Sequence, residues 1–477
     1  MKRIISAYLG IFLILFTACD SFIGLNPIST VTTEAVFKTD KDFQDAVIGC
    51  YAALRDQYQN FWQFGDLRGD DSEAQMFKGN TVDYINDFTV DNTAGVLNTT
   101  WLNYYEMIFR TNAVIQNIES IDESVVPNKN RHIGEARFLR ALAYFDLIRI
   151  FGPVPLITEN ITVEESYTIP RTDVETVYDE IIADLNTAAQ LLPTQYNGTD
   201  VGRATAGAAT ALLGRVYLTR GDFTNAEATL LEVTRMGYAL LDDYNDLFNY
   251  DLDEHHSEYI FDVEYQDGGL GMGSSFTHNF APRVPAILNL YGISGQGGDN
   301  QNPTDALFSV FTDDDLRKDI TVARGAVDDQ GVFIPLPPNQ VRAFTKKYIT
   351  PTNVNDGKAN WKVIRYADVL LMLAEALNEN GKTEEALGYL NQVRERAGVS
   401  RYEGLTADET REKIYLERRL ELSFEGHRWF DLVRTGRAYE VMQSTGMKEY
   451  MTVFPIPLVQ LQVVNNPQIL SQNPGYE

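Results

Sequence analysis

The chain has 477 residues, of which 44% are hydrophobic and 11% aromatic, so it holds enough apolar material for a large folded interior and is not a disordered polymer. Its 40 basic and 67 acidic residues give a net charge of −27 at pH 7. This charge argues against nucleic acid as a partner, because such binding depends on basic surface that neutralises phosphates.

The first residues follow the pattern of a bacterial lipoprotein signal. Lys2 and Arg3 precede an apolar run over 4–16, and Ala18 stands directly before Cys19. The run has about 13 residues, whereas a helix needs about 20 to cross a bilayer, so we expect a cleaved signal peptide over 1–18. Cys19 is then the lipid anchor of the mature chain, and several acyl chains together hold a protein on a membrane.

Helical periodicity dominates most of the mature chain. Apolar residues at spacings of three and four predict helices over 43–57, 103–120, 133–150, 174–191 and 409–433. Segments 209–233 and 369–393 share one template, offset by 160 positions, in which a glycine separates two helical runs. This is the helix–turn–helix pattern of tetratricopeptide repeats. We expect about four such pairs in a solenoid scaffold, since each pair needs neighbours to cover its apolar face.

The periodicity disappears between about 244 and 361, where glycine, proline, asparagine and aromatic residues prevail. A long irregular stretch inside a folded protein usually carries function, and rigid helices commonly position such loops as a binding surface. The mature chain is therefore expected to have three parts after the signal peptide: an N-terminal region over 19–243, a loop-rich ligand-facing insert over 244–361, and a C-terminal region over 362–477.

Seven segments, in order, resemble the SusD/RagB family of nutrient-binding outer-membrane lipoproteins. The resemblance covers nearly the whole mature chain and rests on LNPISTVTTEAVFKTDKDFQDAVIGCY from Leu25, TWLNYYEMIFRTNAVIQNI from Thr100, EARFLRALAYFDLIRIFGPVPLI from Glu135, NPTDALFSVFTDDDLRKD from Asn302, IRYADVLLMLAEALNENG from Ile364, ERRLELSFEGHRWFDLVRTGRA from Glu417 and FPIPLVQLQVVNNPQILSQNPGY from Phe454.

The resemblance implies a mainly α-helical fold of four tetratricopeptide-like pairs with an irregular ligand-facing region. It also implies a non-catalytic protein of polysaccharide utilisation, displayed on the outer membrane, that passes oligosaccharide or another nutrient to a SusC-like TonB-dependent transporter. The charged residues of the Glu417 segment and the aromatic residues Phe424, Trp429 and Phe430 are expected to be structural, as is Trp101.

Ligand-binding residues vary within this family, so they are predicted from chemistry. Sugars stack their apolar faces on aromatic rings and pair their hydroxyls with planar polar groups, so a glycan site needs both kinds of side chain together. The candidates are Trp62, Phe64, Asp66, Arg68, Asp71 and Tyr84 in the early irregular segment, and Tyr265, Phe276, Asn279, Arg283 and Tyr291 in the central region.

Catalytic and cofactor motifs do not emerge from the sequence. His255 and His256 lack His-Glu-x-x-His spacing, and Ser294 does not stand in a G-x-S-x-G turn. We therefore expect neither an enzyme nor a cofactor or metal centre. Two alternatives remain open: a protein-interaction scaffold built on the tetratricopeptide-like helices, and a receptor for peptide in place of glycan.

Overall fold

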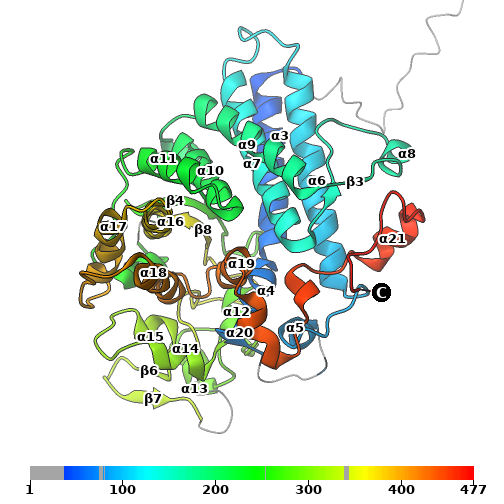
Figure 1. Ribbon diagram of the computed structural model, residues 1–477. Helices are drawn as coiled ribbons and strands as arrows, with labels where there is room; N and C mark the ends of the chain where they lie inside the picture. The colour runs from blue at the N-terminus through cyan, green and yellow to red at the C-terminus, as the bar shows by residue number, and fades with distance from the viewer. Residues whose placement is uncertain (1–36, 75–78, 80, 253, 338–342, 477) are drawn as a thin grey trace, which may run out of the picture.

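The computed structural model describes residues 37–74, 79, 81–252, 254–337 and 343–476. The signal peptide and Cys19 lie outside the described residues. The fold is mainly helical, as predicted (Figure 1). None of the helices in the described ranges is both long and apolar enough to span a membrane.

Four long helices pack side by side in the N-terminal part (Figure 1). They are α3 (Asp40–Tyr58), α6 (Gly95–Ile118), α7 (Lys129–Phe151) and α9 (Val174–Leu191). Side-chain caps begin two of them: Thr39 forms a capping box with Asp42 on α3, and Asp173 accepts from the Thr176 N–H on α9. Such caps satisfy N–H groups that have no partner within the helix. All four predicted helices of this part are confirmed.

The two repeated segments form the predicted helix pairs. The first is α10 (Ala206–Arg220) with α11 (Phe223–Val233), and the second is α16 (Tyr366–Glu379) with α17 (Thr383–Arg396). Gly221 and Gly381 occupy the turns with φ of +75° and +78°, a conformation that glycine adopts without steric cost. The pairs pack on each other through α11 and α16, and the Asn380 side-chain amide donates to the Phe223 carbonyl at 3.0 Å.

The single helix predicted over 409–433 is wrong, because the chain breaks into α18 (Ala407–Glu421) and α19 (Arg428–Arg434). Phe424 and Gly426 adopt φ of +65° and +81° in the intervening turn. The break buries the 422–427 turn against α4 (Phe61–Gly65), where the Gly426 N–H donates to both carboxylate oxygens of Asp66 at 2.9 Å. Charged residues continue through the turn, so the periodicity of the sequence alone does not reveal the break between the two helices.

The central region is irregular as predicted but contains short elements. Strand β4 (Tyr259–Val263) pairs antiparallel with β8 (Trp361–Arg365), which joins the start of the region to its end. The other elements there are η2 (Tyr244–Phe248), α12 (Phe276–Phe280), α13 (Pro285–Leu290), β5 (Asn302–Pro303), α14 (Asp305–Val310), α15 (Lys318–Thr321), β6 (Gly325–Val327) and β7 (Phe333–Pro335).

The remaining elements are short. They are β1 (Ser72–Glu73), which pairs with β5, α5 (Thr81–Asn86), β2 (Val154–Pro155), which pairs with β3 (Arg171–Thr172), α8 (Val163–Ser166), η1 (Gly198–Asp200), α20 (Ala438–Met442), η3 (Gln443–Thr445), η4 (Glu449–Thr452) and α21 (Leu458–Val464).

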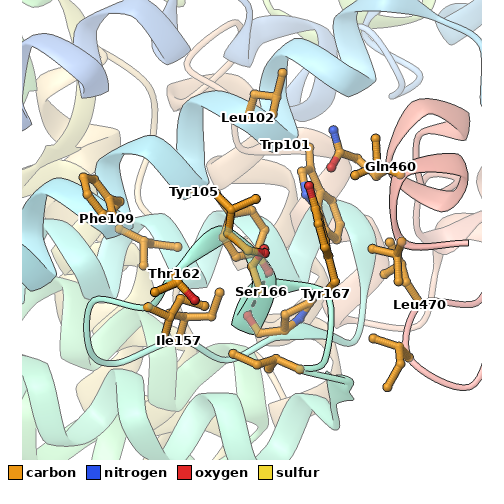
Figure 2. Close-up of a pocket in the computed structure, with 18 of the residues that line it drawn as sticks. Trp101, Leu102, Tyr105, Phe109, Ile157, Thr162, Ser166, Tyr167, Gln460 and Leu470 are labelled. Carbon is orange, nitrogen blue, oxygen red and sulfur yellow. Dashed lines mark hydrogen bonds between the residues drawn. The ribbon is translucent and has the colours of Figure 1, made fainter. Parts of the chain in front are cut away.

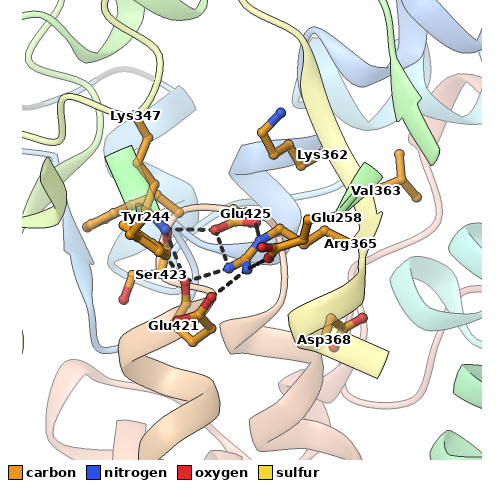
Figure 3. Close-up of polar contacts among 12 residues, drawn as sticks. Tyr244, Glu258, Lys347, Lys362, Val363, Arg365, Asp368, Glu421, Ser423 and Glu425 are labelled. Carbon is orange, nitrogen blue, oxygen red and sulfur yellow. Dashed lines mark hydrogen bonds and ion pairs between the residues drawn. The ribbon is translucent and has the colours of Figure 1, made fainter. Parts of the chain in front are cut away.

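A buried charge network ties β8 to the turn after α18 (Figure 3). The Arg365 guanidinium donates to Glu258 at 2.9 Å and to Glu425 at 2.7 Å, and it also pairs with Glu421. The Lys347 ammonium donates to Glu425 at 2.7 Å and to the Ser423 carbonyl at 2.7 Å. Burial lowers the pKa of Lys347 to about 8, and the surrounding cations hold the pKa of the Glu425 carboxyl below its usual value despite burial.

The segment that begins at Glu417 is structural, as predicted. Trp429, Phe430 and Phe424 are buried, and the charged residues of this segment are paired within the protein. Trp101 is also buried, and its indole ring contacts Phe151 edge-on with centroids 5.3 Å apart.

Candidate ligand-binding face

A cluster of buried aromatic rings supports the loops of the central region. Phe276 lies at its centre, with centroid distances of 5.2 Å to Trp361, 5.5 Å to Tyr348 and 5.9 Å to Phe280. The Trp62 ring meets Phe280 edge-on at 5.3 Å, and its indole N–H donates to the Gln59 carbonyl. Such pairs stabilise a core beyond the area that they bury.

Seven of the predicted ligand residues are buried: Trp62, Phe64, Asp66, Arg68, Asp71, Tyr265 and Phe276. Trp62 has an exposed fraction of 2%, and Phe276 has 0%. A ring enclosed in this way has no free face on which a sugar can stack. The described conformation therefore places these aromatic rings in the core that supports the loops.

The buried polar residues of the early segment have internal partners. The Arg68 guanidinium lies over the rings of Phe88 and Phe454 at 4.3 and 4.1 Å, and it donates to the Met451 carbonyl. Asp71 accepts from the Arg419 side chain at 2.7 Å. Burial raises the pKa of the Asp66 carboxyl to about 8, although the Gly426 N–H opposes that shift. These side chains hold distant segments together.

Two adjoining hollows open among the loops of the central region. The larger, of about 930 Å³, lies between residues 267–271 and 351–356, and the smaller, of about 610 Å³, lies along residues 283–296. They share Gly292 and Ser294, so they form one continuous surface, which we call the loop face. Its polar side chains include Asp267, Asn289, Ser294, Gln296, Asn353 and Asp356.

Of the four predicted ligand residues that are not buried, only some lie at the loop face. Arg283 lines the smaller hollow, and its backbone N–H donates to Asp299 at 3.2 Å. Tyr291 is half-buried beside that hollow, and burial raises the pKa of its phenol to about 12. Asn279 is also half-buried, and its amide bonds Ser275 and Asn300. Tyr84 is 43% exposed but stands on α5, where its hydroxyl donates to the Gly79 carbonyl.

The other polar residues of the loop face were missed in the sequence. Asn289 stands between Leu288 and Leu290, Gln296 between two glycines, and Asn353 between Thr352 and Val354. The sequence signal for this face is the glycine-rich composition of 267–271 and 292–298, which includes Gln296 but neither Asn289 nor Asn353.

A separate apolar groove of about 310 Å³ lies between α6, residues 155–169 and the C-terminal residues 460–470 (Figure 2). Trp101, Tyr105 and Phe109 of α6 form one wall, Tyr167 comes from the segment after α8, and Val463 comes from α21. Phe109 is 55% exposed, and Leu102, Val163 and Val463 are exposed beside it. An exposed apolar patch of this kind on a folded protein usually marks a contact with another macromolecule.

The described residues contain no group of three or more histidine, cysteine, aspartate or glutamate side chains that could hold a metal ion. The architecture is thus a rigid helical scaffold that carries a polar loop face and a distinct apolar groove.

Comparison with known proteins identifies the family. The family described as "SusD family" matches residues 339–476, and "Starch-binding associating with outer membrane" matches residues 26–218. SusD-like protein P2 of Formosa agariphila is 30% identical over 497 aligned positions, which cover 94% of this chain and 95% of that protein. Starch-binding protein SusD of Bacteroides thetaiotaomicron is 25% identical, with 73% of each chain covered. The chain belongs to the SusD family.

Solved structures agree with this assignment. A laminarin-binding SusD-like protein is 30% identical, with a TM-score of 0.79 over 92% of this chain and 100% of that one. Surface glycan-binding protein A from Bacteroides thetaiotaomicron, in complex with laminarihexaose, has the same fold at 21% identity, with a TM-score of 0.77 over 91% and 99% of the two chains. SusD-family proteins bind without catalysis, which confirms that this chain is not an enzyme.

Proposed function

We propose that this protein is a lipid-anchored binding protein of the outer-membrane surface that captures oligosaccharide and delivers it to a TonB-dependent transporter. The observation that carries the proposal is the loop face, where amide, hydroxyl and carboxylate side chains line two connected hollows on a rigid support. Sugar hydroxyls require such planar polar partners, and a hollow of this size accepts several sugar units.

Laminarin is the first ligand to test. The solved relative with 30% identity is named for laminarin binding, and the chain covers that relative completely. A neutral glucan also suits a protein with a net charge of −27, since it experiences no electrostatic repulsion. Carbohydrate capture of this type requires release to the transporter, so we expect micromolar to millimolar affinity, about −8 to −4 kcal/mol.

Membrane attachment rests on the lipoprotein signal and on the family described as associating with the outer membrane. Acylation at Cys19 after removal of residues 1–18 supplies the anchor. Cys19→Ser is expected to release the protein from the membrane fraction, and retention of this variant in membranes would require another tether.

The scaffold contains helix pairs of tetratricopeptide type. The packing of α10–α11 on α16–α17 supports this assignment, because tetratricopeptide units stack through neighbouring pairs. The long helices α3, α6, α7 and α9 supply the remaining two pairs. The insert over 244–361 is then the ligand-facing part, between an N-terminal region over 19–243 and a C-terminal region over 362–477.

The transporter contact is assigned to the apolar groove. Its lining is dominated by aromatic and aliphatic side chains, which suit a protein surface better than a hydroxyl-rich glycan. A peptide receptor or a protein-interaction scaffold would use the same groove, but neither accounts for the polar loop face.

The test uses the mature body without its acyl chains, laminarin in an affinity gel, and laminarihexaose in a calorimetric titration. We expect laminarin to retard the wild-type protein in the gel. The double variant Arg283→Ala/Asn353→Ala should lose at least tenfold in affinity for both probes. Asn186→Ala, which alters an exposed side chain on α9, is the matched control and should bind as wild type does. Binding that is unchanged in the loop-face variant would contradict the assignment of the site.

A further inference from the structure

A second polar cleft, of about 770 Å³, lies away from both the loop face and the apolar groove. Three segments form it: residues 194–205 between α9 and α10, residues 236–238 after α11, and residues 255–260, which lead into β4. None of the ligand residues predicted from the sequence lines it. We call it the tyrosine cleft, because Tyr196, Tyr238 and Tyr259 all contribute to its wall.

Two of the three rings, those of Tyr259 and Tyr238, are held in place by the protein. Tyr259 meets the His255 ring edge-on at 4.9 Å, and its hydroxyl donates to the Gly202 carbonyl at 3.3 Å. The Tyr238 hydroxyl lies 3.5 Å from the Thr205 hydroxyl, and its ring lies 6.2 Å from Tyr366. Preorganised aromatic rings cost little conformational entropy on binding, so they are suited to stack on the apolar face of a sugar.

The Tyr196 hydroxyl is buried, yet it has no hydrogen-bond partner among the described residues. An unpartnered buried hydroxyl costs on the order of 1–3 kcal/mol, so a folded protein rarely keeps one without water or a ligand to satisfy it. Tyr196 lines the cleft and its hydroxyl lies beneath the cleft surface, so a ligand hydroxyl supplies the missing partner once the ring turns toward the cleft.

The charges around the cleft are compensated inside the protein. Arg203 pairs with Glu135 at 3.1 Å and with Asp200 at 3.0 Å, and the Glu264 carboxylate lies within hydrogen-bond distance, 2.7 Å, of the His255 imidazole. The guanidinium already has two carboxylate partners, so it gives little net attraction to an anionic ligand. The cleft therefore favours a ligand that is neutral and rich in hydroxyl groups.

Strand β4 connects the cleft to the loop face. Tyr259 and Ile260 at the start of β4 line the tyrosine cleft, and Asp267, a few residues beyond its end, lines the larger hollow of the loop face. The eight-residue step from Tyr259 to Asp267 spans at most about 29 Å even when fully extended. One polysaccharide chain is long enough to contact both places at once, and a fragment shorter than their separation contacts only one.

We propose that the tyrosine cleft is a second carbohydrate subsite, which binds another stretch of the neutral polysaccharide chain held at the loop face. The inference rests on the proposed glycan-binding function. Two weak sites on one polymer raise the overall affinity, because binding at the first holds the chain at high local concentration near the second. The cleft thus selects long chains over their short fragments.

The test compares laminarin with laminarihexaose in wild type, Tyr196→Phe, and Tyr196→Phe combined with Gln195→Ala. Tyr196→Phe removes only the unpartnered hydroxyl, so a purely structural role predicts equal or greater stability and unchanged binding. We expect both cleft variants to bind laminarin 3- to 10-fold more weakly, while the loop-face affinity for laminarihexaose changes by less than twofold. Tyr439→Phe, which removes a hydroxyl from an exposed tyrosine on α20, is the matched control.

Hydrogen exchange of the wild type gives an independent readout. Saturating laminarin should protect residues 194–205 and 236–238 in addition to the loop face. If the wild type binds laminarin but the cleft variants match it and these segments show no protection, the second subsite is rejected and the loop face stands. If the wild type binds neither probe and laminarin protects no segment, laminarin is rejected as the ligand, and the second subsite is rejected with it.

Discussion

Gly65 and Gly426 approach each other so closely that a Cβ atom at position 65 would stand 2.4 Å from the Gly426 carbonyl oxygen. The first residue ends α4, and the second lies in the turn that separates α18 from α19. Segments more than 350 residues apart in the chain therefore meet backbone to backbone, below the aromatic cluster that supports the loop face.

Gly65→Ala should destabilise the protein because neither backbone can move away without disturbing the buried turn. Overpacking of this kind costs about 1–3 kcal/mol in free energy of unfolding. Gly95→Ala is the control, since a Cβ atom at that helical position meets nothing within 4 Å, and it should be neutral or slightly stabilising. Urea denaturation of both variants measures the difference, and equal midpoints for Gly65→Ala and wild type would refute the close contact.

Asp66 should make stability depend on pH. Burial raises the pKa of its carboxyl to about 8, against about 3.9 in an unfolded chain, so the folded state keeps a proton that the unfolded state releases. The stabilisation is complete below about pH 4 and is lost as pH rises through 8. Relative to Asp66→Asn, which stays neutral, the wild type should lose more than about 2 kcal/mol between pH 5 and pH 9. Parallel stability curves for the two proteins over that range would rule out the raised pKa.

Neighbouring lysines allow the buried charge network to be tested against a surface ion pair. Lys347 is 0% exposed and pairs with Glu425, whereas Lys346 pairs at 2.7 Å with Asp319, whose side chain is exposed. Lys347→Met keeps the volume but removes the charge, and we expect it to cost about 3–5 kcal/mol in free energy of unfolding. Lys346→Met should cost about 0–1 kcal/mol. Similar losses in the two variants would contradict the network's role.

The helices were largely predictable, whereas the site was not. The bounds of α9 match the expected 174–191, because its apolar periodicity and its Asp173 cap are both local signals. Trp62 illustrates the opposite case: an aromatic residue in an irregular segment has the same local sequence whether it faces a ligand or the core. Its enclosure by Phe280 depends on a contact with a residue more than 200 positions away. Asn353 was missed because the polar residues of its loop follow no periodic pattern.

Trp62→Ala should therefore lower the stability of the fold, and should not act directly on glycan binding. Removal of a buried tryptophan ring leaves a cavity that costs about 3–5 kcal/mol in free energy of unfolding. Asn353→Ala, at an exposed position of the loop face, should change it by less than about 0.5 kcal/mol. Thermal denaturation and laminarin titration on the same samples separate the two effects. Trp62→Ala with wild-type stability but no glycan binding would instead place this indole on the ligand face.

The apolar groove supplies the last prediction, which concerns the transporter. Phe109 in the groove and Phe333 on β7 are each 55% exposed, so a charge at either position should leave the fold nearly unchanged. If the groove is the contact surface, Phe109→Asp buries an uncompensated carboxylate in the interface and should weaken co-purification with the transporter at least tenfold. Phe333→Asp is the matched control for exposure and added charge. Equal recovery of the transporter with both variants would move the contact away from α6. Selective loss with Phe109→Asp, at unchanged laminarin affinity, would show that the docking surface is separate from the surface that binds glycan.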